Sequence, residues 1–155
     1  TFVAVDSHAG SIETSKARVV DAGFSDRIEF EVAASTEYKA AGFDLICFMD
    51  TLHDMGDPVG AVAHARQALN AGGSVLLVEP FANGKVEDNF NPLGRLFYGA
   101  STYFCSANSI AQGGAHTLGA QAGELGLREV FERGGFGSFT RAAETPFNII
   151  YDAKP

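Results

Sequence analysis

Two apolar runs separated by a single helix signal constrain the fold most strongly. Phe43–Met49 is an almost continuous apolar run, and Ser74–Glu79 is a second one. Between them, Asp57 and Pro58 have the residue types of a helix N-cap and first helical position, and Gly72–Gly73 is expected to end that helix. Strands joined through a helix are parallel, and parallel strands are typically buried on both faces. The pattern therefore predicts an open α/β sheet.

Strand and helix signals also alternate over the rest of the chain. The elements expected there are strands at 2–6 and 28–32, a helix capped by Ser11 and closed by Gly23, a helix at 123–133, and strands at 138–143 and 147–153. The last two strands are separated only by Glu144, Thr145 and Pro146, which is too short for a parallel crossover. We therefore expect a Rossmann-like, mostly parallel sheet that ends in an antiparallel hairpin.

Residues 81–118 break this alternation. The stretch is rich in Asn, Gly, Ser and aromatic residues, and it is too long for a plain connection. We predict a lid or substrate segment at about 81–118 with short helices of its own. Residues 1–155 are otherwise expected to form a single domain.

Charge and composition exclude several classes of protein. The net charge of −8 repels nucleic acid, and no apolar stretch is long enough for a membrane helix. No secretory signal is present, and Cys47 and Cys105 are not part of a CxxC motif. We expect a cytoplasmic protein with two buried, reduced thiols, a small-molecule substrate, and neither a nucleic-acid nor a membrane partner.

Polar residues follow the predicted strands, where ligands bind in open parallel sheets. Asp6 ends an early strand, where an acid either binds ribose hydroxyls or complements a helix dipole, and both interpretations stay open. Asp50, His53 and Asp54 follow the next buried run, but their spacing matches no firm metal template, so we expect no metal. His53 is either the wall of a ligand pocket or a hydrogen-bonded turn residue.

Three further groups are candidates for chemistry. Glu79 follows apolar strand residues and needs a partner, so it faces a polar site or a paired neighbour. His53 and His116 are the candidate bases. Aromatic residues of the lid form either an apolar substrate pocket or the lid's own small core; they include Phe97, Tyr98 and Tyr103.

Three segments of the chain resemble a known family. FDLICFMDTLHDMGDP, AVAHARQALNAGGSVLLVEPF and LREVFERGGF…AAETPFNIIYDAKP resemble class I S-adenosylmethionine-dependent methyltransferases, most closely the bacterial branch with an N-terminal winged-helix domain. The resemblance covers essentially the whole chain. It implies an N-terminally truncated, partial catalytic domain that lacks the family's first strand and its Gly-rich loop.

The resemblance also implies roles for individual residues. Asp6 would hold the cofactor ribose, and Ala34 stands where the family usually has an acid next to the adenine. The implied cofactor-binding set is Asp6, Ser7, Ala34, Ser35, Asp50, Thr51 and Leu52. The implied substrate-binding set is Glu79, Phe81, Phe97, Tyr98 and Tyr103, and the catalytic candidates are His53 and His116.

The expected function is methyl transfer from S-adenosylmethionine to a small-molecule acceptor, impaired in this chain because the cofactor loop is absent from it. A non-catalytic nucleotide-binding or oligomerisation module derived from a methyltransferase is the alternative. A nicotinamide dehydrogenase is disfavoured by the hairpin and by the lack of GxGxxG. Three arrangements are open at the missing strand: a piece of a longer product, direct pairing of the flanking strands, or a second chain that covers the gap in a homo-oligomer.

Overall fold

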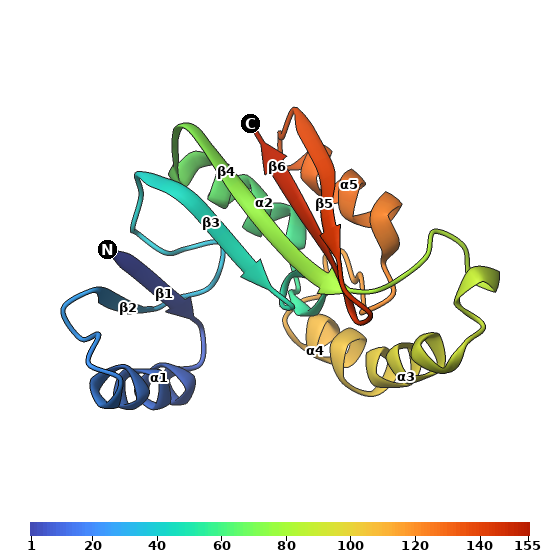
Figure 1. Ribbon diagram of the computed structural model, residues 1–155, viewed down its shortest axis with the longest axis horizontal. Helices are drawn as coiled ribbons and strands as arrows, with labels where there is room; N and C mark the ends of the chain where they lie inside the picture. The colour runs from blue at the N-terminus through green and yellow to red at the C-terminus, as the bar shows by residue number, and fades with distance from the viewer. The chain divides into compact units, whose positions relative to one another are not determined.

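The computed structural model describes residues 1–155, which form two compact units, residues 1–41 and 42–155 (Figure 1). The first unit contains strand β1 (Phe2–Asp6), helix α1 (Ala9–Asp21) and strand β2 (Ile28–Val32). β1 and β2 pair in parallel, from Phe2 opposite Ile28 to Asp6 opposite Val32. The expectation of a single domain stays a prediction.

Helix α1 begins earlier than its sequence indicates. Its N-cap is His8, whose ring Nδ1 accepts a hydrogen bond from the Ser11 backbone N–H at 3.2 Å. The prediction that Ser11 caps the helix is therefore wrong. Ser, Thr, Asp and Asn are the usual caps, so an imidazole in this role has no standard sequence signal.

The second unit contains a four-stranded sheet in the order β3-β4-β6-β5. Its strands are β3 (Phe43–Met49), β4 (Leu69–Pro80), β5 (Ser138–Glu144) and β6 (Asn148–Lys154). Its helices are η1 (Leu52–Asp54), α2 (Pro58–Ala68), η2 (Glu87–Asn89), α3 (Pro92–Ala100), η3 (Ser101–Cys105), α4 (Ser106–Ala111) and α5 (Gly123–Arg133). β3 and β4 are parallel, whereas β6 is antiparallel to β4 and β5. The α/β class and the terminal antiparallel hairpin are confirmed.

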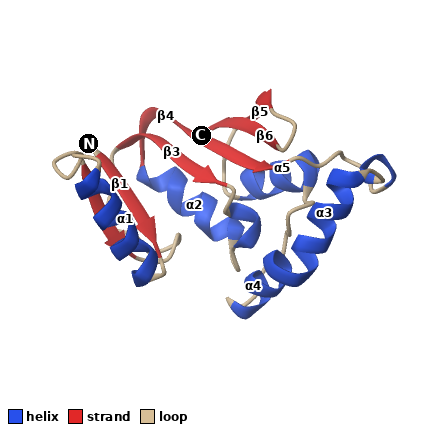
Figure 2. Ribbon diagram, turned by 60° about the horizontal axis from the view of Figure 1, so that its bottom comes forward, coloured by secondary structure: helices blue, strands red, loops and turns tan.

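The core of the second unit lies between the sheet and two helices. Figure 2 shows α2 and α5 together on one side of the strands. Phe131 of α5 packs against Phe139 of β5 with ring centroids 4.9 Å apart, and Phe139 stacks on Tyr151 of β6 at 4.6 Å. Phe131 and Tyr151 are almost fully buried. This aromatic packing fixes α5 against the hairpin.

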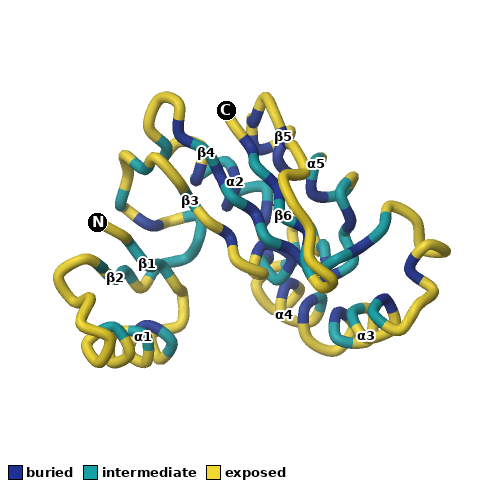
Figure 3. Tube along the Cα trace, viewed as in Figure 1, coloured by how far each residue is buried: buried dark blue, intermediate teal, exposed yellow.

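Strand β3 differs from its prediction. Only one of its faces packs into the core, because α2 and α5 lie on a single side of the sheet (Figure 2). Figure 3 shows that much of β3 is exposed. Phe48 is buried, whereas Leu45 and Met49 are 52% and 53% exposed. The expectation that both faces are buried is wrong for β3. Because no helix covers the other face of β3, Cys47 is exposed, and the prediction that it is buried is wrong. Cys105 is buried as predicted.

Gly72 and Gly73 do not end helix α2, so the prediction that they do is wrong. α2 ends at Ala68, and Leu69 already pairs with Phe43 in the sheet. The register then shifts, so that Leu45 pairs with Ser74 and the residues between form an irregularity in β4. Gly72 has φ +84°, and a Cβ on Gly73 would lie 2.8 Å from the Phe43 carbonyl oxygen. The pair allows an irregular turn of the strand close to β3.

Residues 81–118 contain η2, α3, the π-helix η3 and α4, so this stretch has short helices of its own. Figure 1 shows α3 and α4 near the carboxyl end of β4. None of the helices in the structure has both the length and the apolar character to span a membrane. Action of this segment as a lid stays a prediction.

Candidate functional site

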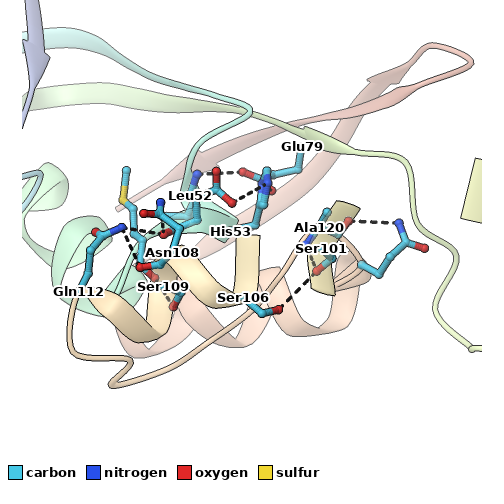
Figure 4. Close-up of polar contacts among 12 residues, drawn as sticks. Leu52, His53, Glu79, Ser101, Ser106, Asn108, Ser109, Gln112 and Ala120 are labelled. Carbon is cyan, nitrogen blue, oxygen red and sulfur yellow. Dashed lines mark hydrogen bonds and ion pairs between the residues drawn. The ribbon is translucent and has the colours of Figure 1, made fainter. Parts of the chain in front are cut away.

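A buried histidine–carboxylate pair lies at the carboxyl ends of the parallel strands β3 and β4. His53 belongs to η1, directly after β3, and Glu79 is near the end of β4. His53 Nδ1 and Glu79 Oε2 are 2.6 Å apart, and the Leu52 N–H donates to Glu79 Oε1 at 3.1 Å (Figure 4). His53 is 4% exposed and Glu79 is 2% exposed. Both carboxylate oxygens therefore have partners in the protein interior.

Burial and pairing shift the pKa values of this pair. Burial raises the pKa of the Glu79 carboxyl, because desolvation penalises its charged form, and the hydrogen bond from His53 opposes this only in part. Burial alone would lower the pKa of His53. The hydrogen bond and charge of Glu79, with the charges of Asp54 and Asp50, outweigh it, so the pKa of His53 is raised. The pair thus retains a proton between carboxylate and imidazole.

The second ring nitrogen of His53 faces two other groups. Its Nε2 is 3.2 Å from the buried Asp54 Oδ1, which is its ion-pair partner when the ring is protonated. The His53 ring, the Asp54 carboxylate and the Cys105 sulfur offer atoms that all lie within 4.8 Å of one another. Burial, reinforced by the nearby Asp54 carboxylate, raises the pKa of the Cys105 thiol to about 11. One nitrogen, one oxygen and one sulfur therefore meet at this point.

Helix α4 and the residues that follow it hold the turn that carries His53. Ser109 Oγ donates to the Met55 carbonyl at 2.9 Å, and Gln112 Nε2 donates to the Asp54 carbonyl at 3.0 Å. The Gly119 N–H donates to the His53 carbonyl at 3.2 Å. Figure 4 shows Ser109 and Gln112 on the same side of η1. These hydrogen bonds attach residues 106–119 to the turn.

Sequence reasoning missed Ser109, Gln112 and Cys105 as parts of this site. Polar residues in a short helix are usually exposed to solvent, so nothing in the local pattern marks Ser109 or Gln112 as contacts of a distant turn. Their partners are more than fifty residues earlier in the chain. A motif search within one segment cannot find such a pair.

The other candidate base and the lid aromatics have neighbours other than the buried pair. His116 is half-buried, and its Nδ1 is 3.5 Å from Arg133 Nη1. The Phe81 ring packs against the core and has the Arg141 guanidinium 5.7 Å from its centroid. Phe97 is half-buried, whereas Tyr98 and Tyr103 are 37% and 79% exposed.

The residues predicted to bind a cofactor are distributed over both units. In the first unit, the exposed Asp6 accepts the His8 N–H through Oδ1 at 2.7 Å. Its neighbour Ser7 is exposed, and Ala34 and Ser35 are half-buried.

In the second unit, Asp50 and Thr51 are exposed, and Leu52 is a fully buried core residue. Asp50 has φ +58°, which is uncommon for a residue other than glycine and is most often adopted by Asn and Asp. The backbone there turns sharply out of β3. The Asp50 N–H still donates to the Val78 carbonyl at 2.8 Å.

Comparisons with known proteins define the class. Residues 1–77 match the family model of a methyltransferase domain. The fold of the whole chain is that of the class I S-adenosylmethionine-dependent methyltransferases, which confirms the resemblance inferred from the sequence. S-adenosylmethionine is the cofactor of that class. No curated protein matches the chain.

Three solved structures illustrate the likeness. A Nostoc punctiforme protein assigned as an O-methyltransferase aligns with a TM-score of 0.74 and 18% identity, covering 98% of this chain and 44% of its own. Human N-acetylserotonin methyltransferase, solved with S-adenosylmethionine, aligns at 0.68 and 20%, covering 98% and 39%. An O-methyltransferase family 2 protein from Planctomyces limnophilus, solved with apigenin, aligns at 0.68 and 18%, covering 99% and 43%. The chain spans less than half the length of each.

Proposed function

We propose that this chain carries the acceptor side of a methyltransferase site, which transfers a methyl group from S-adenosylmethionine to a small-molecule hydroxyl or amine. The observation that supports this most directly is the buried Glu79–His53 pair, at the strand ends where α/β folds bind ligands. A buried base fixed by a carboxylate suits removal of a proton from an acceptor.

His53 is the base in this proposal, and Glu79 is its positioning residue. The 2.6 Å contact to Nδ1 orients the ring and stabilises the positive charge that His53 gains when it accepts a proton at Nε2. His116 is the weaker candidate, because its ring lies beside the Arg133 guanidinium and not beside a carboxylate. The remaining lid residues, Phe81, Phe97, Tyr98 and Tyr103, are proposed to contact the acceptor.

Individual residues fit the cofactor within each unit. The exposed Asp6 carboxylate has the chemistry to accept hydrogen bonds from two ribose hydroxyls. Asp50 and Thr51 are exposed at the carboxyl end of β3, and we propose that they lie near the methionine end. When bound, the cofactor supplies a methyl group on a positively charged sulfur. His53 accepts the proton that the acceptor loses.

The test measures methyl transfer and binding separately. Isotope-labelled S-adenosylmethionine at millimolar concentration is incubated with the full chain and a panel of small phenols and amines. Transfer should fall at least tenfold in His53→Asn and remain near the parent value in His116→Asn. Equal transfer by the parent and His53→Asn would overturn the assignment of the base.

We also propose that this chain binds S-adenosylmethionine only weakly, which impairs methyl transfer. Calorimetric titration with S-adenosylmethionine tests this. Without a Gly-rich loop to hold the methionine carboxylate, we expect binding weaker than micromolar. Micromolar affinity would contradict the impairment. Tight binding together with no transfer to any acceptor would instead support a non-catalytic nucleotide-binding module.

A further inference from the structure

We propose that His53, Asp54 and Cys105 form a binding site for a thiophilic divalent cation of the Zn²⁺ type. Binding of the cation does not rest on the proposed methyl transfer, although the same His53 ring takes part in both.

The spacing of the three donors suits a metal ion of this size. Their ligand atoms lie within 4.8 Å of one another. Zinc binds nitrogen and oxygen at about 2.0–2.2 Å and sulfur at about 2.3 Å, so ligand atoms in a tetrahedral site are roughly 3.3–3.8 Å apart. A side-chain contraction of about 1 Å would therefore bring all three atoms to coordination distance.

Glu79 prepares His53 for this role. Because Glu79 Oε2 is 2.6 Å from Nδ1, the ring keeps its proton on that side. A cation that displaces the Nε2 proton to the solvent would then bind the lone pair that is directed at Asp54. A carboxylate behind a histidine is the arrangement usually found behind metal-bound imidazoles. Nearly complete burial of His53 also limits the number of ring orientations.

The buried oxygen of Asp54 is also placed to bind a cation. Asp54 Oδ1 is shielded from solvent, and its neighbours are His53 Nε2 at 3.2 Å and the Cys105 thiol. A cation that displaces the protons of His53 Nε2 and Cys105 would be coordinated by all three side chains.

The sulfur defines which cations the site would select. Cys105 is the last residue of the π-helix Ser101–Cys105, and short π-helical segments occur frequently at functional sites. Its thiol loses a proton to the solvent when the metal–sulfur bond forms, and the metal must supply the free energy because the pKa of the free thiol is about 11. Thiolate and imidazole favour Zn²⁺ or Co²⁺ over Mg²⁺.

Three protein ligands leave a fourth position open to water or to another ligand. A cation at the site would also join η1 to the segment that carries Cys105, alongside the Ser109 and Gln112 hydrogen bonds. If His53 is the base, the cation occupies the Nε2 lone pair and should inhibit methyl transfer. That last consequence alone rests on the proposed function.

Co²⁺ is the probe for the experiment, because a thiolate bound to Co²⁺ gives a near-ultraviolet charge-transfer band and tetrahedral Co²⁺ gives strong visible bands. Titration of the full, reduced chain with Co²⁺ should produce both, and Zn²⁺ should remove them whereas a hundredfold excess of Mg²⁺ should not. Cys105→Ser should lose the charge-transfer band. Cys47→Ser is the matched control and should keep it, because Cys47 is the exposed cysteine outside the cluster.

Asp54→Asn provides a second variant that keeps both cysteines. We expect its Co²⁺ affinity to be at least tenfold lower, with the charge-transfer band retained at saturation. Absence of a charge-transfer band in the parent chain, its persistence in Cys105→Ser, or unchanged affinity in Asp54→Asn would each overturn the site. Since these readouts are spectroscopic, failure of methyl transfer does not affect them.

Discussion

Glu79 Oε2 lies 2.6 Å from His53 Nδ1, and the two side chains are 2% and 4% exposed. The contact explains why an acid directly follows four apolar residues of a strand. A buried carboxylate is tolerated when it is paired and hydrogen-bonded, and Glu79 has both His53 and the Leu52 N–H as partners. The pair also connects the ends of β3 and β4, so it contributes to stability as well as to the proposed chemistry.

Glu79→Gln should destabilise the chain by about 2 kcal/mol, because the amide keeps the shape of the side chain but removes the charge that pairs with His53. The free energy of unfolding in urea measures this. Glu124→Gln is the control: its partner Arg128 is about one-third exposed, and we expect less than about 0.5 kcal/mol. If the two variants were equally stable, the buried pair would contribute no more than a surface one.

Gly56→Ala should separate the His53 turn from α4. A Cβ on Gly56 would lie 2.6 Å from the Gln112 backbone oxygen, which cannot move without shifting the helix end. We expect a loss of about 1–3 kcal/mol and faster amide hydrogen exchange in residues 106–112.

Gly99→Ala provides the matched control for this substitution. Gly99 lies in α3, and its Cβ would meet nothing within 4 Å. Alanine is the better helix former, so this variant should gain about 0.5–1 kcal/mol. A Gly56→Ala chain as stable as Gly99→Ala would show that the turn and α4 are not in contact in solution.

Tyr151→Phe should leave stability at neutral pH unchanged or raise it by up to about 1 kcal/mol. The Tyr151 hydroxyl is buried without a hydrogen bond, while the ring that stacks on Phe139 is kept. Urea unfolding at pH 7 of the parent, Tyr151→Phe and the exposed control Tyr103→Phe tests this. A loss above 1 kcal/mol would indicate that the hydroxyl does have a partner.

The stability of Tyr151→Phe should depend less on pH than that of the parent in alkaline solution. Burial raises the pKa of Tyr151 to about 12, above the value of about 10 expected for an unfolded chain. The folded state binds the proton of the Tyr151 hydroxyl more tightly than the unfolded state does. The stability that this difference contributes is complete below pH 10 and is lost between pH 10 and 12. The parent should lose up to about 1.4 kcal/mol per pH unit more than Tyr151→Phe over that range. Parallel pH profiles would contradict the shift.

The two cysteines should differ in reactivity. Cys47 is exposed on β3, whereas Cys105 is 8% exposed and its thiol pKa is about 11. Iodoacetamide at pH 8 should therefore alkylate Cys47 first, as peptide mass spectrometry would show, and Cys47→Ser should remove the fast phase. Equal rates for both thiols in the folded chain would contradict the burial of Cys105.

Much of the fold could be predicted from local patterns. Helix α5 and the two strands of the hairpin lie within a residue or so of their predicted bounds, because periodicity and a short link are properties of adjacent residues. Asp57 caps α2 through Gly60 N–H, as the Asp–Pro pair indicated. The prediction of Ser11 as the cap of α1 is wrong, because His8 caps the helix with a ring nitrogen in place of the usual hydroxyl or carboxylate oxygen.

Tertiary structure decided the remaining features. The apolar residues of β3 do not reveal that helices cover only one face of its sheet, so the exposure of Cys47 could not be predicted. The need of Glu79 for a partner was evident from the sequence, but its choice of His53 depends on the register of β3 and β4. Cys105 meets Asp54 because a distant helical segment folds back onto the turn. Sequence alone specifies which groups require partners, whereas chain topology determines which groups meet, since contacts between distant residues depend on how all the intervening elements pack.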